Sequence, residues 1–160
     1  MDESQARSRI ADYEGNVPHM YKDSKGIKTI GIGFNLERSG AREMIESVGA
    51  DYDKVCEGEE PLTEDQIATL FNHDLQHAID QASSVVSSFG SLNDPRQFVI
   101  VDMIFNMGAG GVSGFHHTIQ MINESNWEAA GAGMKDSHWY GQVGIRAEKD
   151  VHMMVTGEWA

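Results

Sequence analysis

Glu14, Asp23 and Thr29 follow one another near the start of the chain, with eight residues between the first two and five between the last two. Two carboxyl groups in unlike surroundings suit the cleavage of a glycosidic bond, because one must be protonated to assist the leaving oxygen while the other is ionised to activate water or attack carbon. A threonine hydroxyl beside them can orient that water. The chain also holds twenty-five acidic residues, and most such pairs are solvated surface charges, so spacing alone leaves both interpretations open.

The elements around these three residues are expected to bring them to one strand surface. Residues 5–13 favour a short helix that Gly15 and Pro18 end, so Glu14 stands where the helix gives way to irregular chain. Residues 20–36 change to a period of two around the turn-like sequence SKG, which predicts a β-hairpin or a small meander with Asp23 at the hairpin turn.

Glycines make one face of the second predicted strand almost bare. Successive side chains of a strand point to opposite sides, so Ile30, Ile32 and Phe34 should share one face. Thr29, Gly31 and Gly33 should share the other. Glycine inside a strand marks the close approach of a ligand or of another part of the chain, and the local sequence favours neither over the other.

Helical patterns fill most of the remaining chain. Thr63 and Gln66 form a capping box for a long helix, and Asp94 and Pro95 supply an N-cap and a first-turn proline for an almost wholly apolar helix. Ser125 and Glu128 form a second capping box. The expected helices, besides the first, are 41–48, 63–86, 96–107, 115–123, one begun by Ser125, 137–140 and 144–156.

These elements predict a single α+β domain over residues 1–160. A sheet lobe over about 14–60 is joined by a connecting helix, about 63–86, to a helical lobe made of about 87–160 together with 1–13, and a cleft is expected between the lobes.

The composition limits the kinds of partner and cofactor that this protein is expected to bind. Twelve basic against twenty-five acidic residues give a net charge of −13, which repels nucleic acid at long range. The single cysteine, Cys56, excludes an internal disulfide. No secretion signal or membrane-spanning run is recognised, so synthesis in the cytosol without membrane insertion is expected. His73 and His77 have metal-ligand spacing but no third strong ligand, so we expect no metal, no cofactor and a monomer.

Six sequence blocks occur in the order that characterises one known family. They are RIADYEG, YKDSKGIKTIGIG, LFNHD, NMGAGGVSGF, the pair WY at 139–140, and TGEW. With these blocks and the spacing of its two acids, the chain resembles the T-even bacteriophage type of lysozyme, glycoside hydrolase family 24, over almost its whole length. The resemblance implies a lysozyme-like fold and hydrolysis of the β-1,4 bond between N-acetylmuramic acid and N-acetylglucosamine in peptidoglycan. It implies Glu14 as general acid, Asp23 as the base that guides water, Thr29 as a water-holding partner, and inversion at the anomeric carbon.

The same resemblance assigns further site residues. Arg146 matches a basic residue that pairs with the catalytic glutamate, and Phe105 matches a cleft wall residue. The remaining expected substrate contacts are Gly33, Asn35, Asn106 and Thr118.

Several positions depart from the family pattern. Phe34 stands in place of a histidine, which would leave Asp74 without its partner. Asn106 replaces a glutamine, His138 an arginine and Gly133 an asparagine. We therefore expect altered sugar contacts around a retained chemistry.

Two other functions fit the same residues. A lytic transglycosylase needs an acid but closes the muramic sugar on itself instead of admitting water, and Asp23 and Thr29 argue against it. A non-catalytic module that binds the wall or a protein is the second, since fold does not fix function. A free phage endolysin, a tail-borne lysozyme, a secreted effector and a domain of a longer chain all remain open, and each would be made in the cytoplasm of a host bacterium and act on its wall.

The acidic charge predicts how lysis depends on salt. Repulsion from an anionic wall should keep activity on whole walls poor at low ionic strength, and activity should rise as the Debye length shrinks from about 30 Å at about 0.01 M to about 10 Å at about 0.1 M. A turbidity assay across this range measures the effect. A steady fall in lysis with added salt would contradict it.

Overall fold

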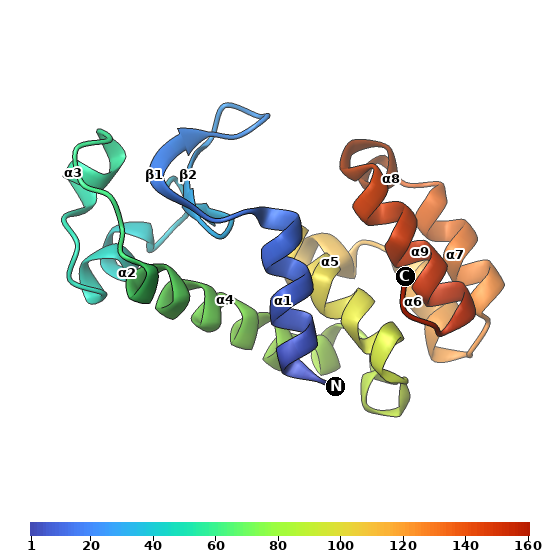
Figure 1. The fold of residues 1–160 in the computed structure, drawn as a ribbon. Helices are drawn as coiled ribbons and strands as arrows, with labels where there is room; N and C mark the ends of the chain where they lie inside the picture. The colour runs from blue at the N-terminus through green and yellow to red at the C-terminus, as the bar shows by residue number, and fades with distance from the viewer. The chain divides into compact units, whose positions relative to one another are not determined.

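The computed structural model describes residues 1–160, which form two compact units. One unit is Arg7–Asp74, and the other combines Met1–Ala6 with Leu75–Ala160. Figure 1 follows the chain through helix α1 (Glu3–Glu14), the small sheet, and the long helix α4 (Glu64–Val85), within which the boundary between the units falls. The α+β lysozyme-like class predicted from the sequence is confirmed.

The sheet of the first unit has three antiparallel strands in the order β1-β2-β3. They are β1 (Val17–Lys22), β2 (Lys28–Gly31) and β3 (Phe34–Asn35). Thr29 of β2 lies opposite Tyr21 of β1 on one side and Asn35 of β3 on the other. The alternation of side chains therefore holds around Thr29, where the predicted hairpin is confirmed.

The prediction of one continuous strand from Lys28 to Phe34 is wrong. The chain turns at residues 32–33, and Gly31 and Gly33 have φ of +64° and +65°. Only glycine adopts this left-handed backbone without a steric cost. The glycines thus reverse the chain and are not a bare strand face.

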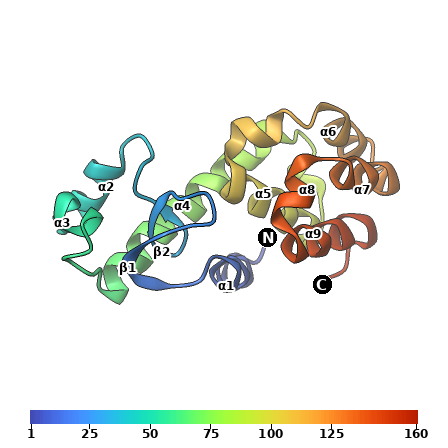
Figure 2. The same cartoon turned by 90° about the horizontal axis from the view of Figure 1, so that it is seen from above.

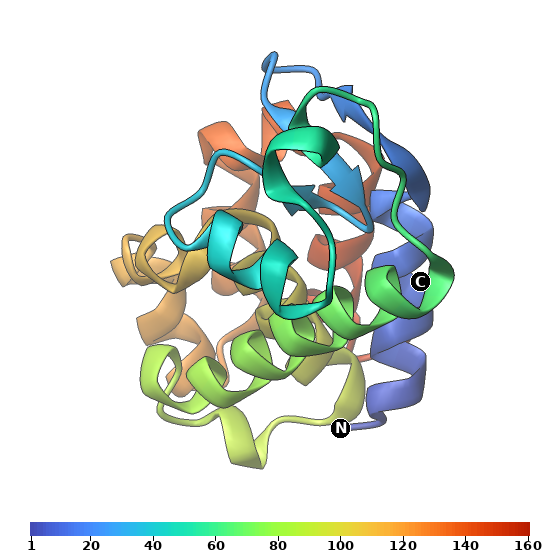
Figure 3. The same ribbon diagram turned by 90° about the vertical axis from the view of Figure 1, so that its left-hand side faces the viewer.

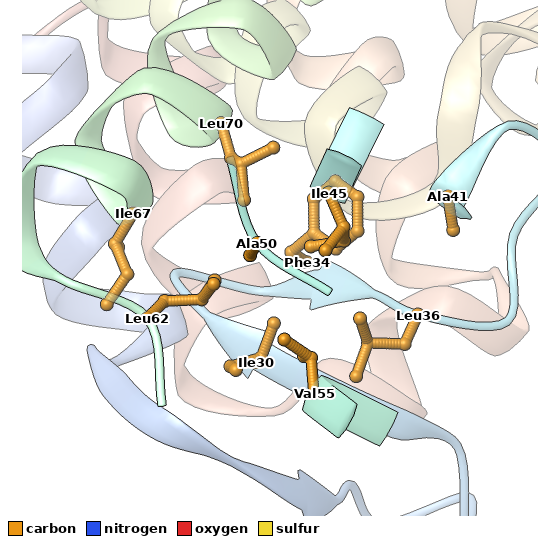
Figure 4. Packing of buried hydrophobic residues seen from close by; sticks show 10 residues of the cluster. All are labelled: Ile30, Phe34, Leu36, Ala41, Ile45, Ala50, Val55, Leu62, Ile67 and Leu70. Carbon is orange, nitrogen blue, oxygen red and sulfur yellow. The ribbon is translucent and has the colours of Figure 1, made fainter. Parts of the chain in front are cut away.

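A hydrophobic core lies on the face of the sheet that carries Ile30 and Phe34 (Figure 4). Ile30, Phe34 and Leu36 from the sheet segment pack with residues of α4 and of two short helices, α2 (Ala41–Ser47) and α3 (Tyr52–Cys56). Figure 3 shows both short helices in front of the hairpin. Helix α3 is not among the helices expected from the sequence. Asp51 caps it by accepting a hydrogen bond from the amide of Lys54, and it buries Val55.

Asp74, which lacks the histidine partner of the family pattern, pairs with an arginine instead. Arg38 donates from Nη1 to Oδ2 of Asp74 at 3.0 Å and from Nη2 to Oδ1 at 2.8 Å. The guanidinium carbon also lies 4.2 Å from the centre of the Phe34 ring. A planar guanidinium can pair with a carboxylate and stack on a ring at the same time, so one arginine contacts both Asp74 and Phe34.

The second unit is helical (Figure 2). Its elements besides the end of α4 are the 3₁₀ turn η1 (Phe89–Ser91), α5 (Asp94–Ser113), α6 (His116–Asn123), α7 (Trp127–Lys135), α8 (His138–Val143) and α9 (Ile145–Thr156). Helix α5 is interrupted at Gly108, where φ is 80° and ψ is 158°. No single helix has the length and hydropathy of a membrane span, and only the bent pair α5 and α6, counted together, meets that standard.

Three helix starts test the predicted caps. The Thr63–Gln66 capping box is confirmed, since each residue's amide donates to the other's side chain at 2.9 and 3.2 Å. For α5 the N-cap is Asn93, not Asp94, and for α7 it is Asn126, not Ser125. Each asparagine side chain accepts the capping hydrogen bond from a backbone amide. Asn93 lies one residue before the predicted cap and Asn126 one residue after it, which is within the usual uncertainty of helix ends.

Two carboxylates and one arginine are buried between α5 and α9. Asp102 and Asp150 are fully buried, and Arg146 donates from Nε and Nη2 to the two oxygens of Asp102 at 3.0 and 2.7 Å. Burial raises the pKa of Asp150 well above its ordinary value, and the negative charge of Asp102 raises it further. Asp150 therefore keeps its proton to a higher pH than a surface aspartate does, which spares the core an unpaired charge.

The raised pKa of Asp150 predicts how stability changes with pH. The stability contributed by protonated Asp150 is complete below the pKa of an unfolded-chain aspartate and is lost as pH rises through the raised pKa. Asparagine cannot ionise, so the free energy of unfolding of Asp150→Asn should rise relative to that of wild type as the pH increases. The difference should grow by about 1.4 kcal/mol for each pH unit by which folding raises the pKa of Asp150. Urea unfolding from about pH 4 to about pH 8 measures this. Glu148→Gln, an exposed change on the same helix, is the control, and parallel wild-type and Asp150→Asn profiles would contradict the prediction.

Candidate active site

Glu14 is the last residue of α1, and its carboxyl group lies against the backbone of Gly33. A Cβ atom on residue 33 would stand 2.6 Å from Oε2 of Glu14 and 2.9 Å from its Cδ. The sequence left open whether a ligand or another part of the chain approaches these glycines, and at Gly33 the structure shows the close approach of another part of the chain. Gly31 is the same kind of position, since a Cβ there would lie 3.2 Å from the side chain of Ile67.

Asp23 begins the turn between β1 and β2. Its Oδ1 accepts hydrogen bonds from the amides of Lys25 and Ile27 at 2.8 and 2.9 Å, and its backbone carbonyl accepts from the amide of Gly26 at 2.9 Å. The turn backbone fixes the carboxylate through one oxygen. Oδ2 is left to interact with water or a substrate.

Thr29 is almost fully buried, at 6% exposure. Its hydroxyl donates to the carbonyl oxygen of Ile27 at 2.9 Å. Since a hydroxyl has one hydrogen and two lone pairs, this bond commits the hydrogen and leaves Oγ1 as an acceptor. A water molecule beside Thr29 would have to donate to it.

Tyr21 is a site residue that the sequence analysis missed. It lies opposite Thr29 across the hairpin. Burial raises the pKa of its phenol, and the negative charges of Glu14 and Asp23 raise it further, so both carboxyl groups lie within electrostatic range of this one hydroxyl. The strand register could have identified Tyr21, because it lies two residues before Asp23 on the strand that pairs with Thr29.

The first unit therefore brings together its predicted site residues. Gly33 contacts Glu14, Thr29 pairs with Tyr21, and Tyr21 is close to both acids. Asn35 pairs with Thr29 on the other side, and its side-chain oxygen accepts from the amide of Glu37 at 2.7 Å.

One predicted site residue of the second unit, Thr118, lines a cavity of about 540 Å³. Thr118 and Trp139 line it, with Phe115, whose ring meets that of Trp139 edge-on at 6.4 Å. Asn106 is not in the lining but accepts a hydrogen bond from Nε1 of Trp139 at 3.1 Å, which fixes the indole. The other lining residues are Gly111, Gly114, His116, His117, Gly133, Asp136, Ser137 and His138.

Gly133, one of the departures from the family pattern, has a packing consequence. The side chain of Thr118 occupies the space that a Cβ on residue 133 would need. Phe105 is half-buried on α5 and does not line the cavity. Arg146 is fixed by the two oxygens of Asp102, and its pairing with Glu14 stays a prediction.

Comparisons with known proteins identify the family of this chain. A sequence profile of the phage lysozyme family matches residues 11–149. Probable T4-type lysozyme 2 of Dictyostelium discoideum is 29% identical over 152 residues, which cover 90% of this chain and 89% of that protein. The pre-baseplate central spike protein Gp5 of Enterobacteria phage T4 is 30% identical over 90% of this chain and 26% of its own length. The peptidoglycan hydrolase gp36 of Pseudomonas phage phiKMV is 30% identical over 92% of this chain and 15% of its own length. The chain therefore belongs to the phage lysozyme family of cell-wall hydrolases.

Proposed function

We propose that this protein hydrolyses the β-1,4 bond between N-acetylmuramic acid and N-acetylglucosamine in peptidoglycan, with inversion at the anomeric carbon. The observation that carries the proposal is the arrangement of Glu14, Asp23 and Thr29 around Tyr21 within one compact unit. The phage lysozyme family supplies the substrate class. No cofactor is needed, and the protein acts as a monomer that is made in the cytoplasm and reaches the wall from there.

The attacking water is held by two acceptors. Thr29 Oγ1 has its hydrogen committed to Ile27, and Asp23 Oδ2 carries no backbone hydrogen bond, so a water between them donates one hydrogen to each. Its lone pair then points away from both groups, toward the anomeric carbon. Two acceptors thus orient the water as a nucleophile.

The bonds change in a single displacement. The water oxygen bonds to the anomeric carbon as its proton passes to Asp23, and the bond from that carbon to the bridging oxygen breaks as Glu14 gives that oxygen a proton. Attack on the face opposite the leaving group inverts the configuration. No covalent sugar intermediate forms.

Each unit contributes sugar-binding residues in this proposal. In the first unit they are Gly33 and the amide of Asn35, which Glu37 orients. In the second they are Phe105, Thr118 and Asn106, and the cavity lined by Phe115 and Trp139 supplies the aromatic groups that sugar rings favour. Asn106 acts by holding Trp139.

Substitution of either acid tests the mechanism. Glu14→Gln removes the proton donor and Asp23→Asn the base, and each should lower the rate of glycan cleavage by at least about 100-fold. Purified sacculi are digested and the released muropeptides are analysed by mass spectrometry, with proton NMR of the first anomer formed. Glu43→Gln, an exposed change on α2, is the control.

The products separate the competing functions. Hydrolysis gives fragments with a free reducing end, whereas a transglycosylase gives fragments lighter by one water. Absence of any muropeptide release would leave a binding module, and full activity of Glu14→Gln would end its assignment as the acid.

Gly33→Ala tests whether the Glu14 contact sets the rate. The new Cβ cannot coexist with Oε2 of Glu14 at 2.6 Å, so the carboxyl group must move, and misplacing a reacting group by about 1 Å costs on the order of 100-fold in rate. The activity should fall at least about 10-fold in a folded protein. Gly58→Ala is the matched control, because Gly58 has φ of +77° but nothing near its Cβ position. Equal losses in the two variants would show that backbone strain alone is responsible.

A further inference from the structure

Lys22 and Lys28 stand directly opposite each other next to the turn that closes the β1–β2 hairpin ribbon. The amide of Lys28 donates to Oε2 of Glu37 at 2.6 Å, and its carbonyl accepts from the amide of Leu36 at 2.9 Å, so both backbone groups point away from β1. Lys22 and Lys28 are therefore a pair without mutual backbone hydrogen bonds, the arrangement in which opposing side chains lie closest. Like charges in such a pair repel each other.

Neither ammonium group has an ion-pair partner, although the chain carries an excess of thirteen negative charges. Other basic groups of this unit do have partners: Arg38 binds Asp74, and Arg42 binds Asp53. Lys22 and Lys28 are thus two neighbouring cations without counterions.

Both lysines line a cavity of about 490 Å³, on the side of the ribbon opposite Thr29. Helix α3, which packs against β1, closes it with Tyr52 and Cys56, and Glu37 and Gly26 complete the lining. The Tyr52 hydroxyl donates to the carbonyl of Leu36, which commits its hydrogen. Lys22 and Lys28 are therefore the charged donors among the residues that line the cavity.

We propose that Lys22 and Lys28 bind one carboxylate group of a ligand in this cavity, and that the ligand is a stem peptide of peptidoglycan. Two lysines and the carboxylate of Glu37 give the lining a net charge of about +1, which matches a single carboxylate better than a doubly charged phosphate. A carboxylate between the lysines also removes their mutual repulsion. The choice of peptide rests on the proposed function, because stem peptides are the carboxylate-bearing part of that substrate.

Direct binding tests the site without any need for hydrolysis. The full-length protein is titrated with the free tripeptide L-alanyl-γ-D-glutamyl-diaminopimelate while the lysine side-chain NMR signals are followed. Lys22→Gln with Lys28→Gln should weaken binding at least about 5-fold, as expected for loss of two charge-assisted contacts. Lys54→Gln removes the same charge from α3 outside the cavity lining and should leave affinity unchanged.

A second variant moves affinity in the opposite direction. Glu37→Gln keeps an oxygen that can accept the Lys28 amide but removes the opposing charge, so binding should tighten about 2-fold or more. The tripeptide with its carboxylates converted to amides should not bind. The Glu14→Gln protein should bind normally, so failure of this site and failure of the catalytic assignment are distinguishable.

Three results would overturn the site. The first is the absence of saturable shifts at Lys22 and Lys28, and the second is an equal loss of affinity in Lys54→Gln. The third is tighter binding of inorganic phosphate than of the tripeptide, which would indicate a different ligand.

Discussion

The contact between the Glu14 carboxyl group and the backbone of Gly33 is the constraint on which the active site depends. It requires a residue without a side chain at a position where φ is positive. It also requires the chain to reverse between β2 and β3 so that the turn meets the end of α1. The buried residues on either side of the turn, Ile30 and Phe34, fix that reversal by packing into the core. The place of the Glu14 carboxyl group is thus set by core packing.

Local patterns predicted the parts of the site that depend on local hydrogen bonds. The turn after Asp23 follows from SKG, and the Thr63–Gln66 capping box follows from spacing, because partners a few residues apart are visible in the sequence. The turn at residues 32–33 was missed because the alternation of apolar residues and glycines continues through it. A period of two cannot distinguish a strand from a tight turn whose glycines lie at the same spacing.

Contacts between segments far apart in the sequence could not be predicted from such local patterns. Asp74 and Arg38 are thirty-six residues apart, and nothing near either one indicates that an arginine replaces the missing histidine partner. Helix α3 is five residues long, too short for a hydrophobic period to show. Tyr21 looked like an ordinary strand residue until the register placed it beside Thr29. The resemblance to a known family predicted Glu14 and Asp23 as site residues, but only the fold shows that Tyr21 lies near them.

Charge acts on two length scales in this molecule. At long range the net charge of −13 opposes approach to an anionic polymer, and physiological salt screens this repulsion over a Debye length of about 8 Å. Within a few ångströms the local arrangement decides, because Arg38 and Arg146 are already committed to Asp74 and Asp102. Attraction for a negatively charged group is thereby left to cations without a counterion, such as Lys22 and Lys28. An acidic wall hydrolase of this kind therefore has to recognise the anionic groups of its substrate by short-range contacts after diffusion has brought the two together.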